Sequence, residues 1–346
     1  MRCHTTMNLR RRFDSALRDT VKEWKKQKSV KGIFVFGSYA RDTLTANSDL
    51  NIGVIWDGDE APVQLLTKHK EIRIDLIFMT VKEIEDVTEG RAEDAYRIAE
   101  IVGRLRAAKV LHDKGGNLKA WQKNFAEYSW PANVVDGLLA RAIDGLEDAK
   151  RYDAEGNSVC AVHELRSALF DLGRTILMKN NMFCITRASD VLTEMRMIDP
   201  MIYKLFLRMF KLRGCDEKRL LSILDEIKHW LEVAEDRFEQ TTVDELTTEL
   251  LTQAQREYHG AVNLTVSGDH ELAVLEMQGA TYMLGRALLA TGGMPSMSRG
   301  CALVTQLRDN ETIYFNQILV EYGDLDFQPA AIRRGIGEAL FIARRL

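Results

Sequence analysis

The 346-residue chain lacks the features that mark secreted, membrane-spanning or metal-stapled proteins. Its five cysteines are odd in number and far apart, and no C-x-x-C pair occurs, so we expect neither a zinc site nor a disulfide framework. No apolar run approaches the ~18 residues that a membrane-spanning helix needs. No apolar segment follows the charged N-terminus as it would in a signal peptide. These absences predict a globular protein in a reduced, cytoplasmic setting.

Strong net charge is also absent, because 47 lysines and arginines are set against 51 aspartates and glutamates, for a net charge of −4. Such a surface does not attract nucleic acid as a whole. No basic stripe with interleaved aromatic residues occurs either, so we expect no nucleic-acid partner. Only the segment that ends at Lys31 is locally basic. We interpret it as a solvated helix face, with a rim that attracts phosphate as the alternative.

The part of the chain up to His112 alternates between helical and strand patterns. Residues 8–28 and 81–112 carry apolar side chains at helical spacing. Three strands and one short helix are predicted between these two segments. They cover residues 32–36, 39–45, 50–55 and 71–78, of which 39–45 is the helix. This order predicts a small mixed sheet with helices, which is an α+β domain.

Gly115-Gly116 is the clearest linker signal, and every pattern beyond it is helical. The predicted helices cover residues 133–152, 158–179, 189–211, 216–238, 243–264, 270–290, 297–319 and 329–345. Leu138–Leu177 aligns with Leu250–Leu289 without a gap, and the identities include the run Leu-Gly-Arg. Gly156 and Gly268 share one predicted turn in this alignment. We therefore predict three parts: the α+β domain at 1–115 and two related helical bundles at 116–240 and 241–346.

Residues 37–54 carry the chain's most informative motif, GSYARDTLTANSDLNIGV. A Gly-Ser turn follows one predicted strand, and a Ser-Asp pair opens the next. Asp49 and Asn51 are two positions apart on a strand, so their side chains point to the same face. Asp75 lies on the polar face of the following strand, which would bring it beside them. Mg²⁺ takes oxygen ligands such as these together with phosphates and waters, so the three positions predict a metal site.

This constellation resembles the polymerase-β-type nucleotidyltransferase superfamily, whose pattern is G-S-x-A-R-G followed by S-D-L-D-L. The resemblance is strong over about residues 30–80. It implies transfer of a nucleoside monophosphate from Mg-NTP to a hydroxyl acceptor on a small molecule or a protein. AMP is the first candidate for the group transferred. The roles it implies are catalytic carboxylates at Asp49 and Asp75, Mg²⁺ ligands at Asp49, Asn51 and Asp75, and nucleotide contacts at Gly37, Ser38 and Arg41.

The chain departs from the family pattern at two positions. Asn51 stands where the family has a second metal-binding Asp, so the site loses a full negative charge between two cations. Asp42 stands where the family has Gly, which predicts an altered phosphate loop. Nearby carboxylates at Asp57, Asp59 and Glu60, and Asp42 itself, are candidate substitutes. The rival hypothesis is a degenerate, non-catalytic module that binds nucleotide or another protein.

The helical region also has a resemblance. Kanamycin-type nucleotidyltransferases join such a domain to a helical domain that helps to hold the acceptor, and residues 107–118 (AAKVLHDKGGNL) are similar to the hinge of that group. A helical-domain Glu is the general base there. Glu164 and its repeat mate Glu276 are the candidates, although no motif places Glu164 in that role and its recurrence favours a structural one. A homodimer is an open alternative to a monomer.

Overall fold

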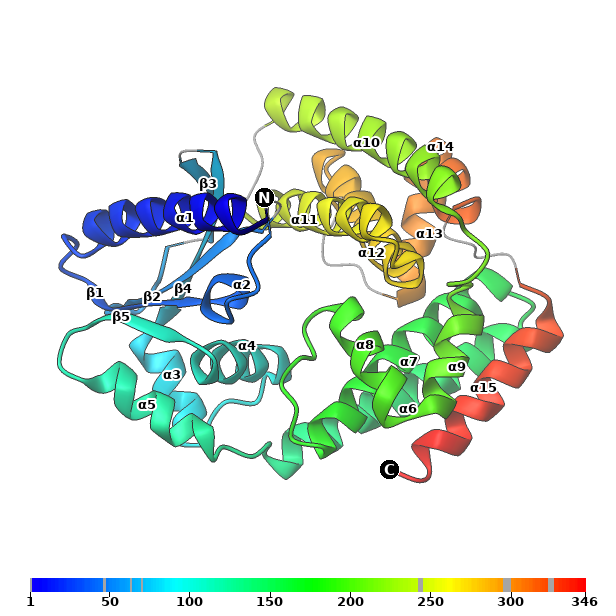
Figure 1. Cartoon of the computed structure of the whole chain (residues 1–346). Helices are drawn as coiled ribbons and strands as arrows, with labels where there is room; N and C mark the ends of the chain where they lie inside the picture. The colour runs from blue at the N-terminus through cyan, green and yellow to red at the C-terminus, as the bar shows by residue number, and fades with distance from the viewer. Residues whose placement is uncertain are drawn as a thin grey trace. The chain divides into compact units, whose positions relative to one another are not determined.

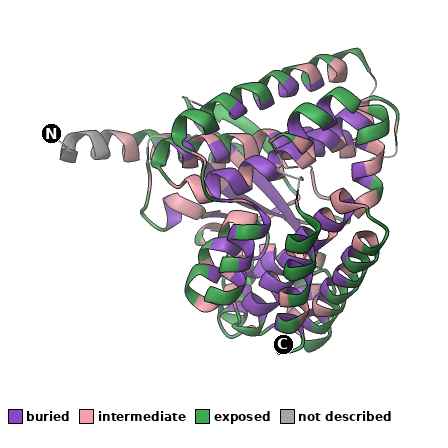
Figure 2. Ribbon diagram, turned by 90° about the vertical axis from the view of Figure 1, so that its right-hand side faces the viewer, coloured by how far each residue is buried: buried purple, intermediate pink, exposed green. Residues whose placement is uncertain are grey.

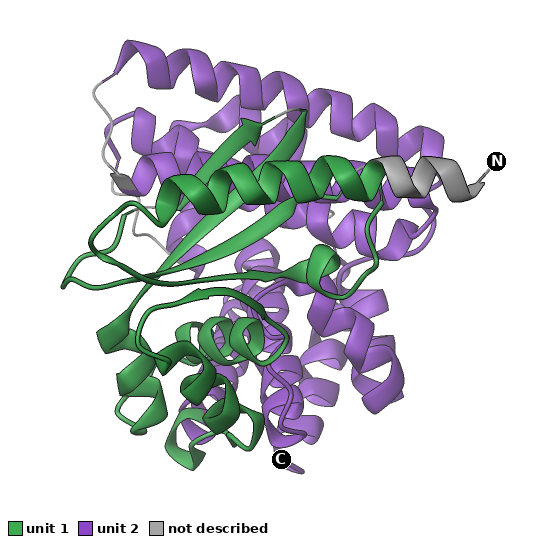
Figure 3. Cartoon of the chain, turned by 60° about the vertical axis from the view of Figure 1, so that its left-hand side comes forward, with its two compact units in different colours: residues 1–134 green, residues 135–346 purple. Residues whose placement is uncertain are grey.

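The computed structural model describes residues 2–45, 48–62, 64–69, 71–241, 245–294, 300–322 and 327–346. It divides into two compact units, unit 1 (residues 1–134) and unit 2 (residues 135–346), which are coloured separately in Figure 3. The Gly115-Gly116 pair lies inside unit 1. The predicted division into three parts at residues 115 and 240 stays a prediction.

Unit 1 contains a five-stranded sheet among its described residues, with helices on both faces (Figure 1). Its elements are α1 (Arg2–Trp24), β1 (Val30–Phe36), α2 (Gly37–Ala40), β2 (Leu50–Trp56), β3 (Leu65–His69), β4 (Ile72–Thr80), α3 (Val81–Thr88), α4 (Ala95–Arg106), β5 (Lys109–Asp113) and α5 (Asn117–Ala126). The strand order is β3-β4-β2-β1-β5, with β2 and β4 parallel and the other neighbours antiparallel. This arrangement confirms the predicted α+β domain.

The two faces of the sheet bury different side chains. Phe13 of α1 packs in one cluster with Ile33, Ile52 and Ile74, whereas α3, α4 and α5 lie on the side of the sheet away from α1 (Figure 1). Figure 2 shows these strands as mostly buried. Because side chains alternate along a strand, the residues between the members of this cluster face the second side. That side carries Asn51 of β2 and Arg73 and Asp75 of β4.

Two strands were not predicted from the sequence, and neither was helix α5. β5 replaces the end of the helical pattern that was predicted to reach residue 112, so that prediction was wrong there. β5 is an edge strand that pairs with β1, with His112 opposite Ile33. β3 is exposed along most of its length and pairs with β4. Both segments obtain their backbone partners from a neighbouring strand, which periodicity within the segment does not reveal.

Unit 2 is entirely helical over its described residues, which confirms the predicted all-α region. Its elements are α6 (Ala132–Ala154), α7 (Ser158–Lys179), α8 (Ala188–Ile198), α9 (Pro200–Met209), α10 (Glu217–Gln240), α11 (Glu245–Ser267), α12 (His270–Thr291), α13 (Gly300–Asn310), α14 (Thr312–Tyr314), the π-helix η1 (Phe315–Val320) and α15 (Pro329–Ala343). Within the described residues of the whole chain, no helix is long and apolar enough to cross a membrane.

Two predicted helices are each divided in the structure. The pattern at 189–211 forms α8 and α9, which separate at Asp199 because Pro200 has no N–H to continue the hydrogen-bond ladder. The pattern at 297–319 forms α13, α14 and η1, and its residues 297–299 lie outside the described residues. The two breaks fall at equivalent positions when the ungapped alignment is extended, since α8 ends at Ile198 and α13 ends at Asn310.

The two segments related by the ungapped alignment have the same turn. Gly156 joins α6 to α7 with φ of 77°, and Gly268 joins α11 to α12 with φ of 85°. In each turn the glycine N–H bonds the carbonyl three positions back, and the next N–H bonds the carbonyl five positions back. The next residues, Asn157 and Asp269, cap α7 and α12 by accepting from the N–H three positions on. These matching bonds support the predicted duplication, which itself stays a prediction.

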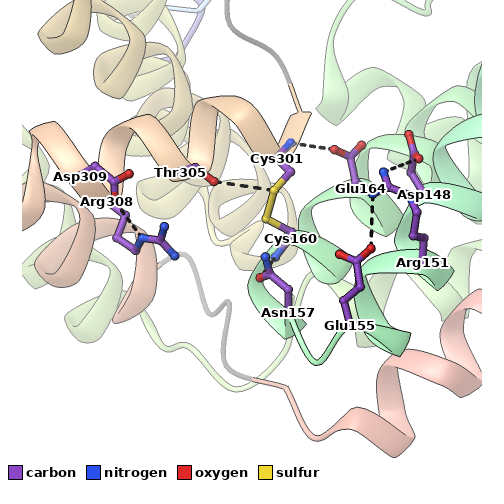
Figure 4. Close-up of a disulfide and its surroundings, with 10 residues drawn as sticks. All are labelled: Asp148, Arg151, Glu155, Asn157, Cys160, Glu164, Cys301, Thr305, Arg308 and Asp309. Carbon is purple, nitrogen blue, oxygen red and sulfur yellow. Dashed lines mark hydrogen bonds and ion pairs between the residues drawn. A yellow bond between two sulfur atoms is a disulfide. The ribbon is translucent and has the colours of Figure 1, made fainter.

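A disulfide joins Cys160 of α7 to Cys301 of α13 across 141 residues of sequence (Figure 4). Cysteine spacing predicted no disulfide framework, and it did not predict this single pair. The packing of α7 against α13 brings the two Cα atoms to 5.0 Å, which lies in the range for a disulfide. A separation this long carries no signal in a single sequence.

Candidate active site

The three residues predicted as metal ligands meet at one end of β2 and β4. These strands are parallel, and Asn51 lies opposite Asp75 in their register. Asp49 directly precedes β2, two positions before Asn51. All three residues are half-buried. The sheet therefore brings these positions together beside the turn at Gly37, which follows the last residue of β1, while their chemical roles stay predictions.

Gly37 permits a close approach that another residue would block. Its φ is 72°, and a Cβ added to it would lie 2.7 Å from Nδ2 of Asn51. Glycine tolerates both the left-handed backbone and the contact. Ser38, the next residue, is half-buried in α2, and Arg41 beyond the end of α2 is exposed. The Gly-Ser turn thus stands directly against the side chain at position 51.

Both carboxylates of the predicted site are hydrogen-bonded by long side chains. Nε of Arg73 donates to Oδ1 of Asp49 at 2.7 Å, and Nε2 of Gln64 donates to Oδ1 of Asp75 at 2.6 Å. Burial lowers the pKa of the Arg104 guanidinium on α4, although the negative charges of Glu100 and Asp75 act in the opposite direction. No site role was predicted for Arg73, Arg104 or Gln64. Only Arg73 gave a signal, since it shares the polar face of its strand with Asp75.

Four of these side chains form two rows across the parallel strands. Asp49 lies beside Arg73 in one row, and Asn51 lies beside Asp75 in the next. Two negative charges and one positive charge leave this group with a formal charge of −1. An aspartate at position 51 would double that charge. The group is therefore less able to attract cations than the family pattern implies.

Asp42 occupies the position where the family pattern has Gly, and its φ is 60°. This left-handed region favours glycine, but Asp enters it more readily than most other residues. Its carboxylate accepts hydrogen bonds from Nη1 of Arg10 at 2.6 Å and Nζ of Lys109 at 3.2 Å, which lower the pKa of Asp42. The loop thus keeps the backbone shape that glycine would allow and gains an ion-paired carboxylate.

The candidate substitutes for the missing carboxylate at position 51 lie elsewhere. Asp57 follows the last residue of β2 and pairs with Lys31 at 2.6 Å, and Asp59 and Glu60 come two and three positions later in the sequence. Asn51 is near the opposite end of this seven-residue strand, so a distance of roughly 17–20 Å separates the two ends. In the part of the chain that the structure describes, no group of three His, Cys, Asp or Glu side chains could hold a metal ion.

Glu164 and Glu276 each accept a hydrogen bond from the start of a helix in unit 2. Oε1 of Glu164 accepts from the Cys301 N–H at 2.7 Å, at the beginning of α13 (Figure 4). Glu276 is hydrogen-bonded by the hydroxyl and backbone N–H of Ser189, at the beginning of α8. Burial raises the pKa of both carboxyl groups. The two acceptors occupy equivalent positions of the repeat and so do the two donors, which favours the structural role inferred from recurrence.

Comparison with known proteins identifies the family of the N-terminal part of the chain. Residues 17–108 match the family model described as a nucleotidyltransferase domain. This part of the chain is therefore a nucleotidyltransferase domain, and the resemblance to that superfamily is confirmed. A solved structure of a nucleotidyltransferase-like protein from Exiguobacterium sibiricum 255-15 is similar to the chain at 15% identity, with a TM-score of 0.39, and the match covers 89% of this chain and 91% of that one. No curated protein matches the chain.

Proposed function

We propose that the chain transfers a nucleoside monophosphate from an NTP to a hydroxyl group of a small molecule or a protein. AMP is the first candidate for the group transferred. One observation carries the proposal: a nucleotidyltransferase domain holds Asn51 and Asp75 side by side, with Asp49 two positions before Asn51 and the Gly37 turn against Asn51. In this reaction the hydroxyl oxygen attacks the α-phosphorus and pyrophosphate leaves in line with it.

The residues present fit a single Mg²⁺ ion that is shared with the nucleotide. Mg²⁺ is often bound through one or two carboxylates plus substrate phosphates. Asp75 offers a carboxylate and Asn51 an amide oxygen, whereas Asp49 is engaged by Arg73. When bound, Mg²⁺ would offset the charge of the phosphates and favour the attack of the hydroxyl.

The chain's own groups would position the nucleotide and take up the proton. Asp75 is the carboxylate assigned to the acceptor hydroxyl, and its hydrogen bond from Gln64 holds its orientation. Ser38 would donate its hydroxyl to a phosphate oxygen. Arg41 is a candidate for the same task, because the two carboxylates nearest to it in the motif, Asp42 and Asp49, are bonded by other residues.

A second function is favoured by the same rows of side chains. Asn51 carries no charge and Arg73 engages Asp49, so the site offers less to cations than three aspartates would. A module that binds nucleotide or a partner protein without transferring anything would tolerate these two features. Transfer separates the first function from both forms of the second, and nucleotide binding separates the two forms of the second.

The test is incubation of the purified protein with Mg²⁺ and each α-³²P-labelled NTP, with hydroxyl acceptors and cell extract. Transfer predicts that label from ATP appears on an acceptor, that Asp75→Asn abolishes it and that Asn51→Asp increases it. Nucleotide binding in calorimetry without label transfer, even by Asn51→Asp, would support the second function. Absence of any nucleotide binding would contradict transfer and a nucleotide-binding module, and would leave only a module that binds a partner protein.

A further inference from the structure

Arg73 is the charged residue of this site for which nucleotidyl transfer supplies no role. It lies on β4 in the row next to Asp75, and the register that pairs Leu50 with Ile74 places it beside Asp49. Its Nε lies 2.7 Å from Oδ1 of Asp49, and the side chains are 45% and 43% exposed. A positive group therefore stands in contact with the carboxylate predicted as the first metal ligand.

We propose that Arg73 is an internal counter-ion that takes the place of one divalent cation. On this proposal the site binds nucleoside triphosphate with a single divalent ion, and it also binds the triphosphate when no divalent ion is present. A guanidinium is always charged and offers several N–H donors in a plane, which suits both carboxylate and phosphate oxygens. Arg73 would thus bridge Asp49 and the phosphates, as a cation does.

The substitution at position 51 and the presence of Arg73 act in the same direction. Three aspartates at positions 49, 51 and 75 would give a charge of −3, which two divalent ions can offset. Asn51 removes one negative charge, and Arg73 adds one positive charge beside Asp49. The resulting −1 suits one added cation better than two, since like charges at close range repel. Each feature changes the charge of the site by one unit, and together they change it by two, which is the charge of one divalent ion.

The inference rests on the nucleotide binding of the proposed function and not on transfer, so it is tested by binding alone. The full chain is compared with Arg73→Gln and with Arg91→Gln. Arg91 is a matched control because it is an exposed arginine of unit 1 that pairs with Asp86, outside the site. Calorimetry measures the affinity for ATP in EDTA, for ATP with Mg²⁺, and for Mn²⁺ without nucleotide.

We expect the unmodified chain to bind ATP in EDTA with an affinity within about tenfold of that in Mg²⁺. Arg73→Gln should weaken ATP binding in EDTA about tenfold and tighten Mn²⁺ binding on the order of tenfold, because one positive charge leaves the site. Arg91→Gln should change neither. Asn51→Asp leaves Arg73 in place, and it should also tighten Mn²⁺ binding and weaken ATP binding in EDTA. It therefore serves as the second variant if Arg73→Gln fails to fold.

Loss of ATP binding by the unmodified chain in EDTA, when it binds ATP with Mg²⁺, would overturn the proposal. Equal affinities for Arg73→Gln and Arg91→Gln would overturn it as well. If no nucleotide binds under any condition, the proposed function fails. The Mn²⁺ titration still decides the role of Arg73 in that case, since an unchanged Mn²⁺ affinity in Arg73→Gln contradicts a counter-ion.

Discussion

Two pairs of carboxylates, one pair in each unit, differ in the groups that donate hydrogen bonds to them. In unit 1, Asp49 and Asp75 are half-buried at one end of the sheet and bonded by the side chains of an arginine and a glutamine. In unit 2, Glu164 and Glu276 are bonded by backbone N–H groups at the starts of helices. A long side chain can rotate away when a ligand arrives, whereas a helix start cannot release its acceptor without losing a cap. Carboxylates of the first kind can serve a substrate, and those of the second kind serve the fold.

The same contrast extends to proton affinity. Burial raises the pKa of Glu257 on α11 to about 7, and the nearby Glu276 adds to the effect. Burial acts on Glu83 of unit 1 in the same direction, but hydrogen bonds from Arg97 and Thr80 outweigh it and lower its pKa. Glu257 therefore favours the protonated form, while Glu83 is held in the charged form by Arg97.

The largest effect should come from exchanging one carboxylate in each unit for its amide. Asp75→Asn should lower the rate of nucleotidyl transfer at least about 100-fold, because it removes a charged oxygen from the reacting end of the sheet. Glu164→Gln should leave the rate within about twofold, since its amide oxygen can still accept from the start of α13. Initial rates with labelled ATP measure both. If Glu164→Gln lowered the transfer rate as much as Asp75→Asn does, Glu164 would have a role in the reaction and the contrast between the units would not hold.

Loss of the disulfide should weaken unit 2 alone. Cys160→Ala should reduce the free energy of unfolding of unit 2 by about 2–4 kcal/mol, because the long loop between Cys160 and Cys301 is no longer closed in the unfolded chain. Hydrogen exchange resolved by segment should show faster exchange in α7 and α13 and no change in β1 and β2. Dithiothreitol should reproduce this pattern in the unmodified chain and add nothing in the variant. Equal acceleration in both units would argue against the assignment.

The contributions of Glu257 in unit 2 and Glu83 in unit 1 to stability should respond to pH with opposite sign. The pKa of Glu257 is about 7 in the folded chain against 4.5 ordinarily, so the folded state binds the proton more tightly. Its contribution is fully present below pH 4.5 and is lost as pH rises through 7, a change of up to about 3 kcal/mol. The lowered pKa of Glu83 gives the reverse, a contribution present above the ordinary pKa and lost as pH falls.

Hydrogen exchange of the segments around Glu257 and Glu83 between about pH 3 and pH 8, corrected for the intrinsic rate, measures this difference. Glu257→Gln should flatten the response of α11 and α12, since the amide does not titrate. A steeper loss of protection at high pH in the variant than in the unmodified chain would show that burial of Glu257 is not the cause.

The smallest effect concerns the two halves of unit 2. Gly156→Ala and Gly268→Ala should each lower the free energy of unfolding by about 1–2 kcal/mol, because both positions have positive φ. A Cβ at either position would touch nothing within 4 Å, so no steric clash adds to this cost. Gly137→Ala is the control: this glycine lies in α6 with equally open space, so alanine should stabilise the helix by about 0.5–1 kcal/mol. Chemical unfolding measures all three. Clearly unequal costs at the two turns would weaken the inference of duplication.

Much of unit 1 could be predicted because its signals are local. The alternation of Ile72, Ile74 and Asp75 along β4 identified the two faces of that strand, and a strand has the same period whatever it pairs with. The close spacing of Asp49 and Asn51 placed them on one face for the same reason. In unit 2, the break between α8 and α9 also has a local signal, which is Pro200. It was not predicted, because apolar residues at helical spacing continue on both sides of it.

The sequence by itself determined the nucleotidyltransferase domain in unit 1, the α+β and all-helical division, and which positions would meet at the end of the sheet. Only the tertiary structure decided that β5 is a strand, that Cys160 bonds Cys301, and that Arg73 engages Asp49. The physical reason is the same in each case. These features depend on a partner that lies far away in the sequence or on another strand, and packing chooses among many partners of the same chemical type.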